Sequence, residues 1–184
     1  MINQSDCVKD FIRTNWTRLD SSLPKLLKGP DRDDILIFLK NRFGIKPNAF
    51  SDFWIVAFSR QAFLFRKQHE NFEWPKENFV RAGLPFIRIV AGYLKPTTVF
   101  VQRFGNLANQ NTLTLNIQTI KELCKAGEIN TREYLKDNVS HLSNGYVIIK
   151  IKGYDTPIGV GLLLEHTRLL CRFPKAIRMH LTVC

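Results

Sequence analysis

Residues 112–127 read TLTLNIQTIKELCKAG, and two periodicities meet within this stretch. Over residues 112–117 apolar and polar side chains alternate, which predicts a β-strand. The apolar side chains of residues 120–124 then recur at intervals of three and four, which predicts a short helix. Gly127 is a typical helix end, because glycine adopts the left-handed backbone conformation without strain. The stretch therefore predicts a strand followed directly by a helix.

Downstream of this unit the sequence predicts further strands. Residues 146–164 hold two apolar, β-branched runs on either side of the turn residues 152–155, which predicts a hairpin. Residues 169–173 and 177–183 are short apolar runs that supply two more strands. Five short strands and one small helix predict a small β-barrel domain over residues 109–184.

Upstream of residue 105 helical spacing is evident twice. Apolar residues three and four apart predict one helix within residues 8–19 and a second within residues 35–43. Asp31 or Asp33 is available as the N-cap of the second helix, and Gly44 is expected to end it. Both apolar faces are expected to belong to the core.

Strands are predicted between these helices and the barrel. The aromatic runs within residues 53–66 predict a hairpin, and residues 84–90 predict a strand that Pro85 places at a sheet edge. The run at residues 99–101 is too short to distinguish strand from helix. Gly105 and the Asn-rich residues after it mark a boundary, so residues 1–108 are predicted to form an α/β domain. The fold class is α+β.

The charge balance is strongly basic. The chain has 27 Lys and Arg against 16 Asp and Glu, which gives a net charge of +11 in 184 residues. No acidic residue lies between Glu77 and Glu122, and none follows Glu165. A field of this sign attracts polyanions, so a phosphate-bearing partner is favoured over an ordinary solvated surface. An anionic membrane surface is disfavoured, because the sequence shows no basic amphipathic helix with an aromatic apolar face.

Several other classes are excluded by missing features. No apolar run is long enough to span a bilayer and no secretory signal is recognised, so an intracellular, cytoplasmic location is expected, nucleolar in a eukaryote. The four cysteines form no CxxC pair, and a zinc site from Cys171, His166 and His180 lacks the close paired spacing of known zinc motifs. No phosphate-binding loop, nucleophile elbow or HExxH helix occurs. Neither a metal nor a cofactor is expected.

A family resemblance lies in the C-terminal third. Residues 118–127, the sequence Asn144-Gly145-Tyr146-Val147 and the sequence Pro157-Ile158-Gly159-Val160-Gly161 resemble a PUA domain, a compact RNA-binding β-barrel of RNA-modifying enzymes and ribosome-assembly factors. The family signature is a strand, a short helix ending in Gly and a hairpin whose second strand carries Ile-x-x-Gly or a close variant. The resemblance implies a PUA-like barrel.

The closing segment extends this resemblance. Residues 172–178, RFPKAIR, are similar to the Tyr-Pro-Lys-Gly-Leu-Arg ending of the C-terminal module in NOL1/NOP2/Sun-type rRNA cytosine-C5 methyltransferases, with Ala176 in place of Gly. Residues 82–85 and 93–98 resemble the segment that precedes the barrel in those enzymes. The layout of an α/β half before the barrel also resembles pre-PUA/PUA ribosome-biogenesis factors, which implies a pre-PUA-like first domain.

The catalytic features of those methyltransferases are missing. None of the four cysteines follows a proline, and Gly159-Val160-Gly161 lacks the third glycine and the helix of a dinucleotide-binding loop. These glycines are expected to mark a close backbone approach within a strand instead. The sequence therefore predicts no enzyme, but a non-catalytic protein that binds structured rRNA or tRNA in RNA modification or ribosome biogenesis.

The resemblance also implies where RNA is held: against the short helix, the loop after Gly127 and the last strands. Lys121 and Lys125 are four residues apart on the helix, hence on one face, where they can meet successive phosphates. Two further cations are expected to extend the surface across the first half. The predicted RNA-binding residues are Lys121, Lys125, Asn130, Arg132, Lys152, Arg172, Lys175, Arg178, Lys95 and Arg103.

Most aromatic residues are expected in the core. Phe53, Trp54, Phe58, Phe63 and Phe65 lie in apolar strands, and Tyr154 alone, in a hairpin turn, is a candidate for base stacking.

Two alternative functions stay open. A protein-interaction adaptor that docks onto a larger RNA-modifying enzyme or assembly factor would show a large exposed apolar patch on residues 1–80. An RNA- or nucleotide-modifying enzyme would need carboxylates such as Asp52, Glu73 and Asp155 around a pocket. The sequence shows no such convergence.

Overall fold

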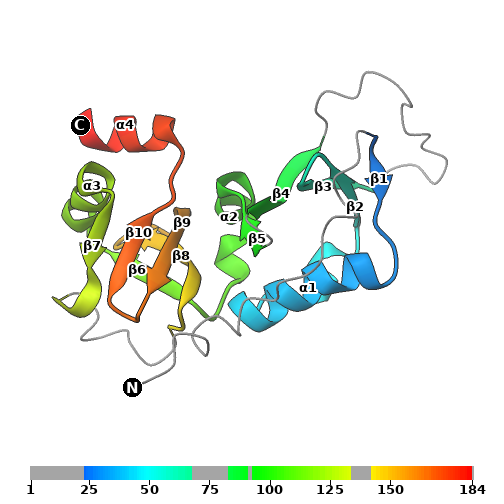
Figure 1. The fold of residues 1–184 in the computed structure, drawn as a ribbon, viewed down its shortest axis with the longest axis horizontal. Helices are drawn as coiled ribbons and strands as arrows, with labels where there is room; N and C mark the ends of the chain where they lie inside the picture. Colours follow the sequence, from blue (N-terminus) through cyan, green and yellow to red (C-terminus); the bar gives the residue numbers. More distant parts are fainter. Residues whose placement is uncertain (1–22, 68–82, 91–92, 134–141, 184) are drawn as a thin grey trace. The chain divides into compact units, whose positions relative to one another are not determined.

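The computed structural model describes residues 23–67, 83–90, 93–133 and 142–183 (Figure 1). Contacts divide them into two compact units, one ending at Phe100 and the other beginning at Val101. Each unit has its own five-stranded sheet, and four α-helices lie in the described part of the chain, so the predicted α+β class is confirmed. The helix predicted within residues 8–19 lies outside the described residues. None of the described helices is long and apolar enough to cross a bilayer.

The predicted second helix is confirmed as α1 (Pro30–Phe43), but its predicted cap is wrong. Neither Asp31 nor Asp33 caps it: the N-cap is Gly29, no side chain bonds the free N–H groups, and both aspartates lie inside the first turn. Pro30 explains the difference, because its fixed φ suits the first helical position and so places the cap at Gly29, before both aspartates. Gly44 ends the helix in the left-handed conformation, as predicted.

The first sheet is an antiparallel meander in the order β1 (Lys25–Leu26), β2 (Phe53–Phe58), β3 (Gln61–Arg66), β4 (Leu84–Val90) and β5 (Tyr93–Pro96), with a 3₁₀ turn η3 (Pro47–Phe50) before β2. The predicted β2–β3 hairpin is confirmed. Its turn residues Ser59 and Arg60 have φ of 46° and 59°, which suits a two-residue turn between Phe58 and Gln61.

The edge position predicted for Pro85 is wrong, because β4 pairs with β3 on one side and β5 on the other. The sheet accommodates the missing N–H locally. Pro85 opposes Phe63 next to a register shift, and β5 ends at Pro96, opposite Ile87, before it reaches Pro85. The Pro85 carbonyl accepts a hydrogen bond from Thr97 Oγ1 at 2.6 Å. A bulge and a short neighbour thus allow proline inside a sheet.

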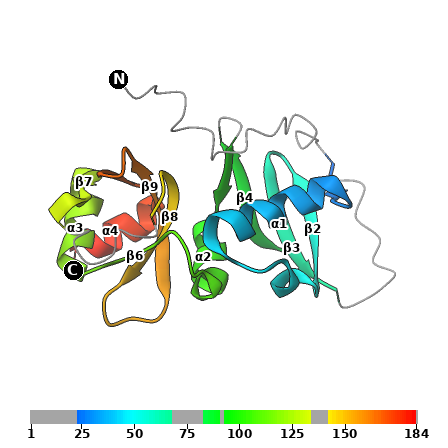
Figure 2. The same ribbon diagram turned by 90° about the horizontal axis from the view of Figure 1, so that it is seen from below.

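One face of this sheet forms the core of the first unit. Side chains on it are buried to 2% exposure or less, namely Ile55, Ala57, Ala62, Leu64, Ile87 and Leu94. Helix α1 runs across the strands in Figure 2 and contributes buried Ile35, Leu39 and Phe43. Phe50 and Phe86 also pack together, with ring centroids 5.2 Å apart.

The second unit begins within α2 (Thr98–Phe104), so the ambiguous run at residues 99–101 is helical. A 3₁₀ turn, η4 (Gly105–Leu107), follows. The remaining elements are β6 (Thr112–Leu115), α3 (Ile117–Ala126), β7 (Glu128–Asn130), η5 (Thr131–Glu133), β8 (Gly145–Ile151), β9 (Pro157–Leu164), β10 (Arg168–Cys171) and α4 (Lys175–Val183).

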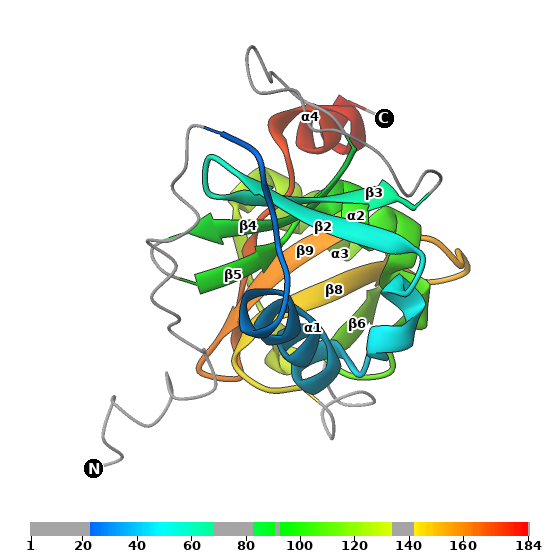
Figure 3. The ribbon, with the colours of Figure 1, turned by 90° about the vertical axis from the view of Figure 1, so that its right-hand side faces the viewer.

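The five strands form a sheet in the order β6-β8-β9-β10-β7 that curls into a half-barrel. Strands β6 and β8 are parallel, and the other pairs are antiparallel. Figure 3 shows β8 and β9 side by side. The predicted hairpin of residues 146–164 is confirmed, and so are the strand at residues 112–115 and the helix after it.

The strand predicted at residues 177–183 is wrong, because these residues belong to α4. Ile177 and Leu181, four residues apart, are the partly buried side chains that pack on the core, as the helical period requires. The helix begins after Pro174, whose carbonyl accepts a hydrogen bond from the Arg178 amide at 3.1 Å. The fifth strand of the sheet is instead β7, three residues that directly follow α3.

The core of the second unit explains the glycines of β9. Val147 and Ile149 of β8, Leu163 of β9 and Leu169 of β10 lie in one buried cluster with α3. A Cβ at Gly161 would lie 2.6 Å from Leu169 Cδ1 and 2.9 Å from Ile149 Cδ1. The predicted close approach at this strand is therefore confirmed for Gly161.

Candidate nucleic-acid interface

Helix α3 positions two lysines at the margin of its buried face. Asn116 caps the helix by accepting a hydrogen bond from the Thr119 amide at 2.8 Å, and Gly127 ends it. Lys121 and Lys125 are three residues before and one residue after Cys124, so both lie within about 100° of it around the helix. Lys121 is half-buried and Lys125 is exposed, on the flank beside Cys124.

Helix α4 brings two more cations to this flank, because α3 and α4 pack against each other. Arg178 lies close enough to Cys124 to act electrostatically on its thiol. Lys175 is one turn before Arg178 and shares its side of the helix. Lys121, Lys125, Lys175 and Arg178 are called the α3–α4 basic cluster below.

The cluster has no acidic partner among the residues that the structure describes: none of its four side chains forms an ion pair there. The neighbouring Glu128 binds Arg168 instead, with Arg168 Nη2 donating to Glu128 Oε2 at 2.8 Å, and this bond raises the pKa of Arg168. Exposed cations without carboxylate partners are available to an external anion.

The thiol pKa of Cys124 reflects the surroundings of the basic cluster. The pKa of its thiol is raised to about 12, chiefly by burial and also by the neighbouring Cys171 thiol, while Arg178 acts in the opposite direction. Cys124 therefore stays protonated in the native state at neutral pH. Cys124 therefore forms part of the apolar boundary beneath the basic cluster and does not act as a thiolate nucleophile there.

Arg172 lies on the opposite side of the sheet from the cluster. In β10, Cys171 contacts the core beneath α3, so the next side chain is directed to the other face. Tyr146 of β8 is on that other face, since its neighbour Val147 belongs to the core. Burial raises the pKa of the Tyr146 hydroxyl and the Arg172 guanidinium lowers it, which places the two groups near each other.

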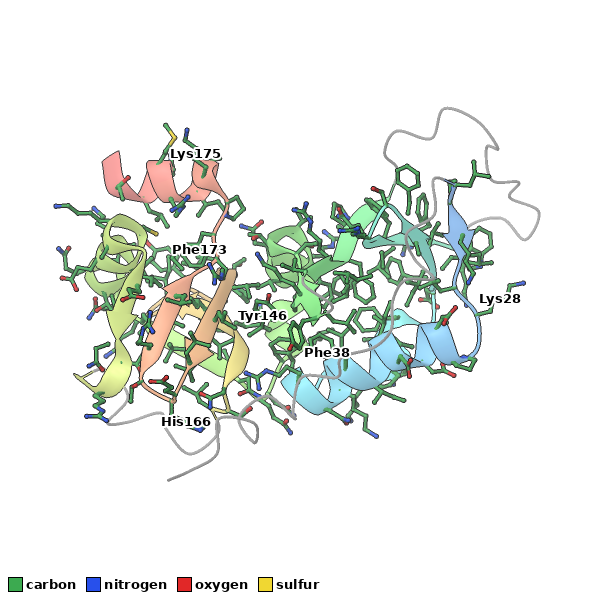
Figure 4. All side chains as sticks on the ribbon, in the orientation of Figure 1. Lys28, Phe38, Tyr146, His166, Phe173 and Lys175 are labelled. Carbon is green, nitrogen blue, oxygen red and sulfur yellow. The ribbon has the colours of Figure 1, made fainter. Side chains whose placement is uncertain are left out.

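Asn130 and Arg132 lie at the far end of β7. Asn130 pairs with Arg168 at the start of β10, and the Thr131 amide donates to the Thr167 carbonyl in the β9–β10 turn at 2.7 Å. Asn130 Oδ1 accepts a hydrogen bond from the Arg132 amide at 3.0 Å, which is a local turn-stabilising role. Figure 4 shows that His166 in this turn and Lys175 lie at opposite ends of the second unit.

The three other predicted cations lie on elements other than α3 and α4. Lys152 is in the β8–β9 turn, and this hairpin continues past β10, because Cys171 pairs with Gly161 and β9 begins four residues earlier at Pro157. Arg103 is exposed in α2. Lys95 is in β5 and belongs to the first unit. Tyr154, the predicted stacking residue, is 69% exposed in the β8–β9 turn.

Met179 completes the face of α4 that carries the cluster, and sequence reasoning missed it. It is 55% exposed and lies on the same arc of α4 as Lys175 and Arg178. In a strand Met179 would share a side with Ile177 and Leu181, whereas in a helix it lies away from both, so helical spacing is the signal that identifies it.

The structure assembles neither a metal site nor a carboxylate site in the part it describes. No group of three or more His, Cys, Asp or Glu there is arranged to hold a metal ion. Asp52 and Asp155 are exposed residues of different units, and Glu73 lies outside the described residues.

Comparison with known proteins adds no relative. No protein-family model matches the chain, and no curated protein matches it either.

Proposed function

We propose that this chain is a non-catalytic RNA-binding protein whose second unit is a PUA-like module acting on structured rRNA or tRNA, in RNA modification or ribosome assembly. One observation carries the proposal: two helices that pack together hold Lys121, Lys125, Lys175 and Arg178 on one flank, with no ion pair to a described carboxylate.

The spacing of the cluster suits a phosphate backbone. Lys121 and Lys125 are one helical turn apart, about 6 Å along α3, and Lys175 and Arg178 form a second pair on α4. An A-form duplex offers rows of phosphates and 2′-hydroxyls across a shallow minor groove, and proteins read it mainly by shape and charge. Met179 and the aliphatic parts of the lysines supply contact area between the charges.

The test measures binding of the full chain to a labelled blunt RNA hairpin over a series of salt concentrations, beside a DNA duplex of equal length. Affinity for the hairpin is expected to fall steeply with salt and to exceed that for DNA. Equal affinity for RNA and DNA would show that the interaction is nonspecific electrostatic attraction. Binding to neither would refute the proposal and favour the adaptor.

A matched pair of variants assigns the surface. Lys125→Gln with Lys175→Gln is expected to reduce the salt slope by about two, one per lost phosphate contact. Lys40→Gln with Lys46→Gln changes the net charge equally at two exposed lysines of the first unit. If both double variants lose the same affinity, the whole field of the protein, and not the cluster, is responsible.

A further inference from the structure

The first sheet has a second face of unusual composition. Because directly opposed residues in antiparallel strands share a face, the pairing of β2 to β5 shows which residues belong to it. This aromatic face, on the side opposite Ile55 and Leu64, comprises Trp54, Val56, Phe58, Gln61, Phe63, Phe65, Arg88, Val90, Tyr93 and Lys95.

The two faces of the first sheet differ in which side chains keep exposed surface. On the reverse face Ile55, Leu64 and Ile87 are buried at the centre, whereas Phe53 and Ile89 are half-buried and Arg66 is exposed at the strand ends. On the aromatic face Val56 and Phe63 are buried at the centre, whereas Trp54, Phe58, Phe65 and Tyr93 are half-buried and Arg88 is exposed. Of the five aromatic residues predicted to lie in the core, only Phe63 is buried, whereas Phe53, Trp54, Phe58 and Phe65 are half-buried.

Cations lie in register with the rings. Phe58 pairs with Gln61, Gln61 with Arg88, and Arg88 with Lys95, so one row across four strands joins a ring to two positive charges. Strands β2 to β5 contain no aspartate or glutamate at all. An apolar protein-docking face does not need this arrangement, whereas an anionic ligand with flat apolar groups matches both halves of it.

We infer that the aromatic face binds unpaired nucleotides of single-stranded RNA, with bases stacked on the rings and phosphates held by Arg88 and Lys95. Stacking on aromatic side chains tolerates any base, and nearby cations follow the backbone. Trp54 and Phe58 are four residues apart on β2, about 13 Å, so two bases can stack at separate positions. The inference rests on the proposed function and extends it from structured to unpaired RNA.

The test uses the full chain with fluorescent ten-nucleotide oligouridine, which has little structure of its own, beside the blunt RNA hairpin. Phe58→Leu keeps an apolar side chain but removes the ring, and is expected to weaken oligouridine binding about fivefold or more. Phe53→Leu is the matched control, because Phe53 is also half-buried on β2 but belongs to the reverse face. Its affinity is expected to stay that of the wild type.

Charge is tested separately. Lys95→Gln is expected to lower the salt slope for oligouridine by about 0.7, the single-strand value for one contact, and Lys46→Gln to leave it unchanged. Crosslinking of 4-thiouridine-substituted oligouridine is expected to label peptides within residues 53–66. Hairpin binding reports on the α3–α4 basic cluster, so its loss would refute the proposed function, whereas the outcomes below concern the aromatic face alone.

Two results would overturn the inference. One is a wild-type chain that binds the hairpin but not oligouridine. The other is a folded Phe58→Leu variant with unchanged oligouridine affinity and no crosslink within residues 53–66. Either result would exclude the aromatic face as a binding surface for single-stranded RNA.

Discussion

The two sheets of this protein present positive charge in different ways. In the first, Arg88 and Lys95 project from the strands themselves, in one row with Phe58. In the second, the cations of the α3–α4 basic cluster lie on helices that cover one face of the sheet. Strand pairing places the ring and the charges in one row across the sheet, whereas helices place charges at regular intervals along a ridge. The two arrangements therefore match the two proposed ligands, unpaired bases on the first surface and a duplex backbone on the second.

The largest effect on stability is expected from Gly83→Ala, directly before β4 of the first sheet. Gly83 has φ of +79°, and a Cβ there would lie 2.7 Å from the carbonyl oxygen of Leu64. Left-handed strain and a clash with backbone together are expected to lower the free energy of unfolding by about 2–4 kcal/mol. Chemical denaturation measures this loss.

Gly153→Ala provides the control for that substitution. Gly153 has φ of +86°, but no atom lies within 4 Å of its Cβ position, so it carries the backbone strain without the clash. A loss as large as that of Gly83→Ala would show that the close approach to Leu64 has no energetic weight.

A smaller loss is expected from Gly161→Ala in the second sheet. The added methyl would meet Leu169 and Ile149, whose side-chain ends can shift slightly, unlike the backbone oxygen beside Gly83. Overpacking of this kind lowers the free energy of unfolding by about 1–3 kcal/mol. If Gly161→Ala proves more harmful than Gly83→Ala in the same denaturation assay, the second core is the more rigid of the two.

The smallest effect is a pH dependence confined to the second unit, which contains Cys124. Its pKa is raised from 9.0 to about 12 in the folded state, so the native protein retains a proton that the unfolded chain loses above pH 9. The contribution is fully present below pH 9 and is lost as the pH rises toward 12. Between pH 8.5 and 9.5 the free energy of unfolding is expected to fall by about 0.7 kcal/mol from this group.

Denaturation of Cys124→Ala across the same pH interval isolates this contribution. The variant removes the thiol, so its stability is expected to fall less steeply than that of the wild type. Parallel pH profiles for the two proteins would contradict the prediction.

Sequence patterns predicted the elements whose local signals agree. The alternation at residues 112–115, the helix ending at Gly127 and the two hairpins all combine periodicity with suitable turn residues. The sequence patterns gave wrong predictions where tertiary contacts determine the local structure. Residues 177–183 are too short for periodicity to separate strand from helix, and Pro85 is tolerated inside a sheet only through its neighbours.

In the candidate site, too, some features follow from local sequence and others from tertiary contacts. The relation between Lys121 and Lys125 follows from local helical spacing and was predictable. The approach of Arg178 to Cys124 depends on how α4 packs on α3, and the placement of Arg172 beside Tyr146 depends on strand order. Neither relation follows from a local sequence pattern. The topology is therefore needed to separate the four residues of the cluster from the other six predicted residues.

The parallel pairing of β6 with β8 has a consequence for how the chain reaches this fold. In the first sheet every neighbour in space is also the next strand in sequence, so pairing begins with short loops such as the one between Phe58 and Gln61. Thr112, by contrast, must find Ile148 across the whole segment that carries α3 and β7. Closing such a loop is entropically unfavourable and slows folding. During synthesis the strands of the first sheet also emerge earlier, so the order of events on the ribosome follows the order of the two sheets.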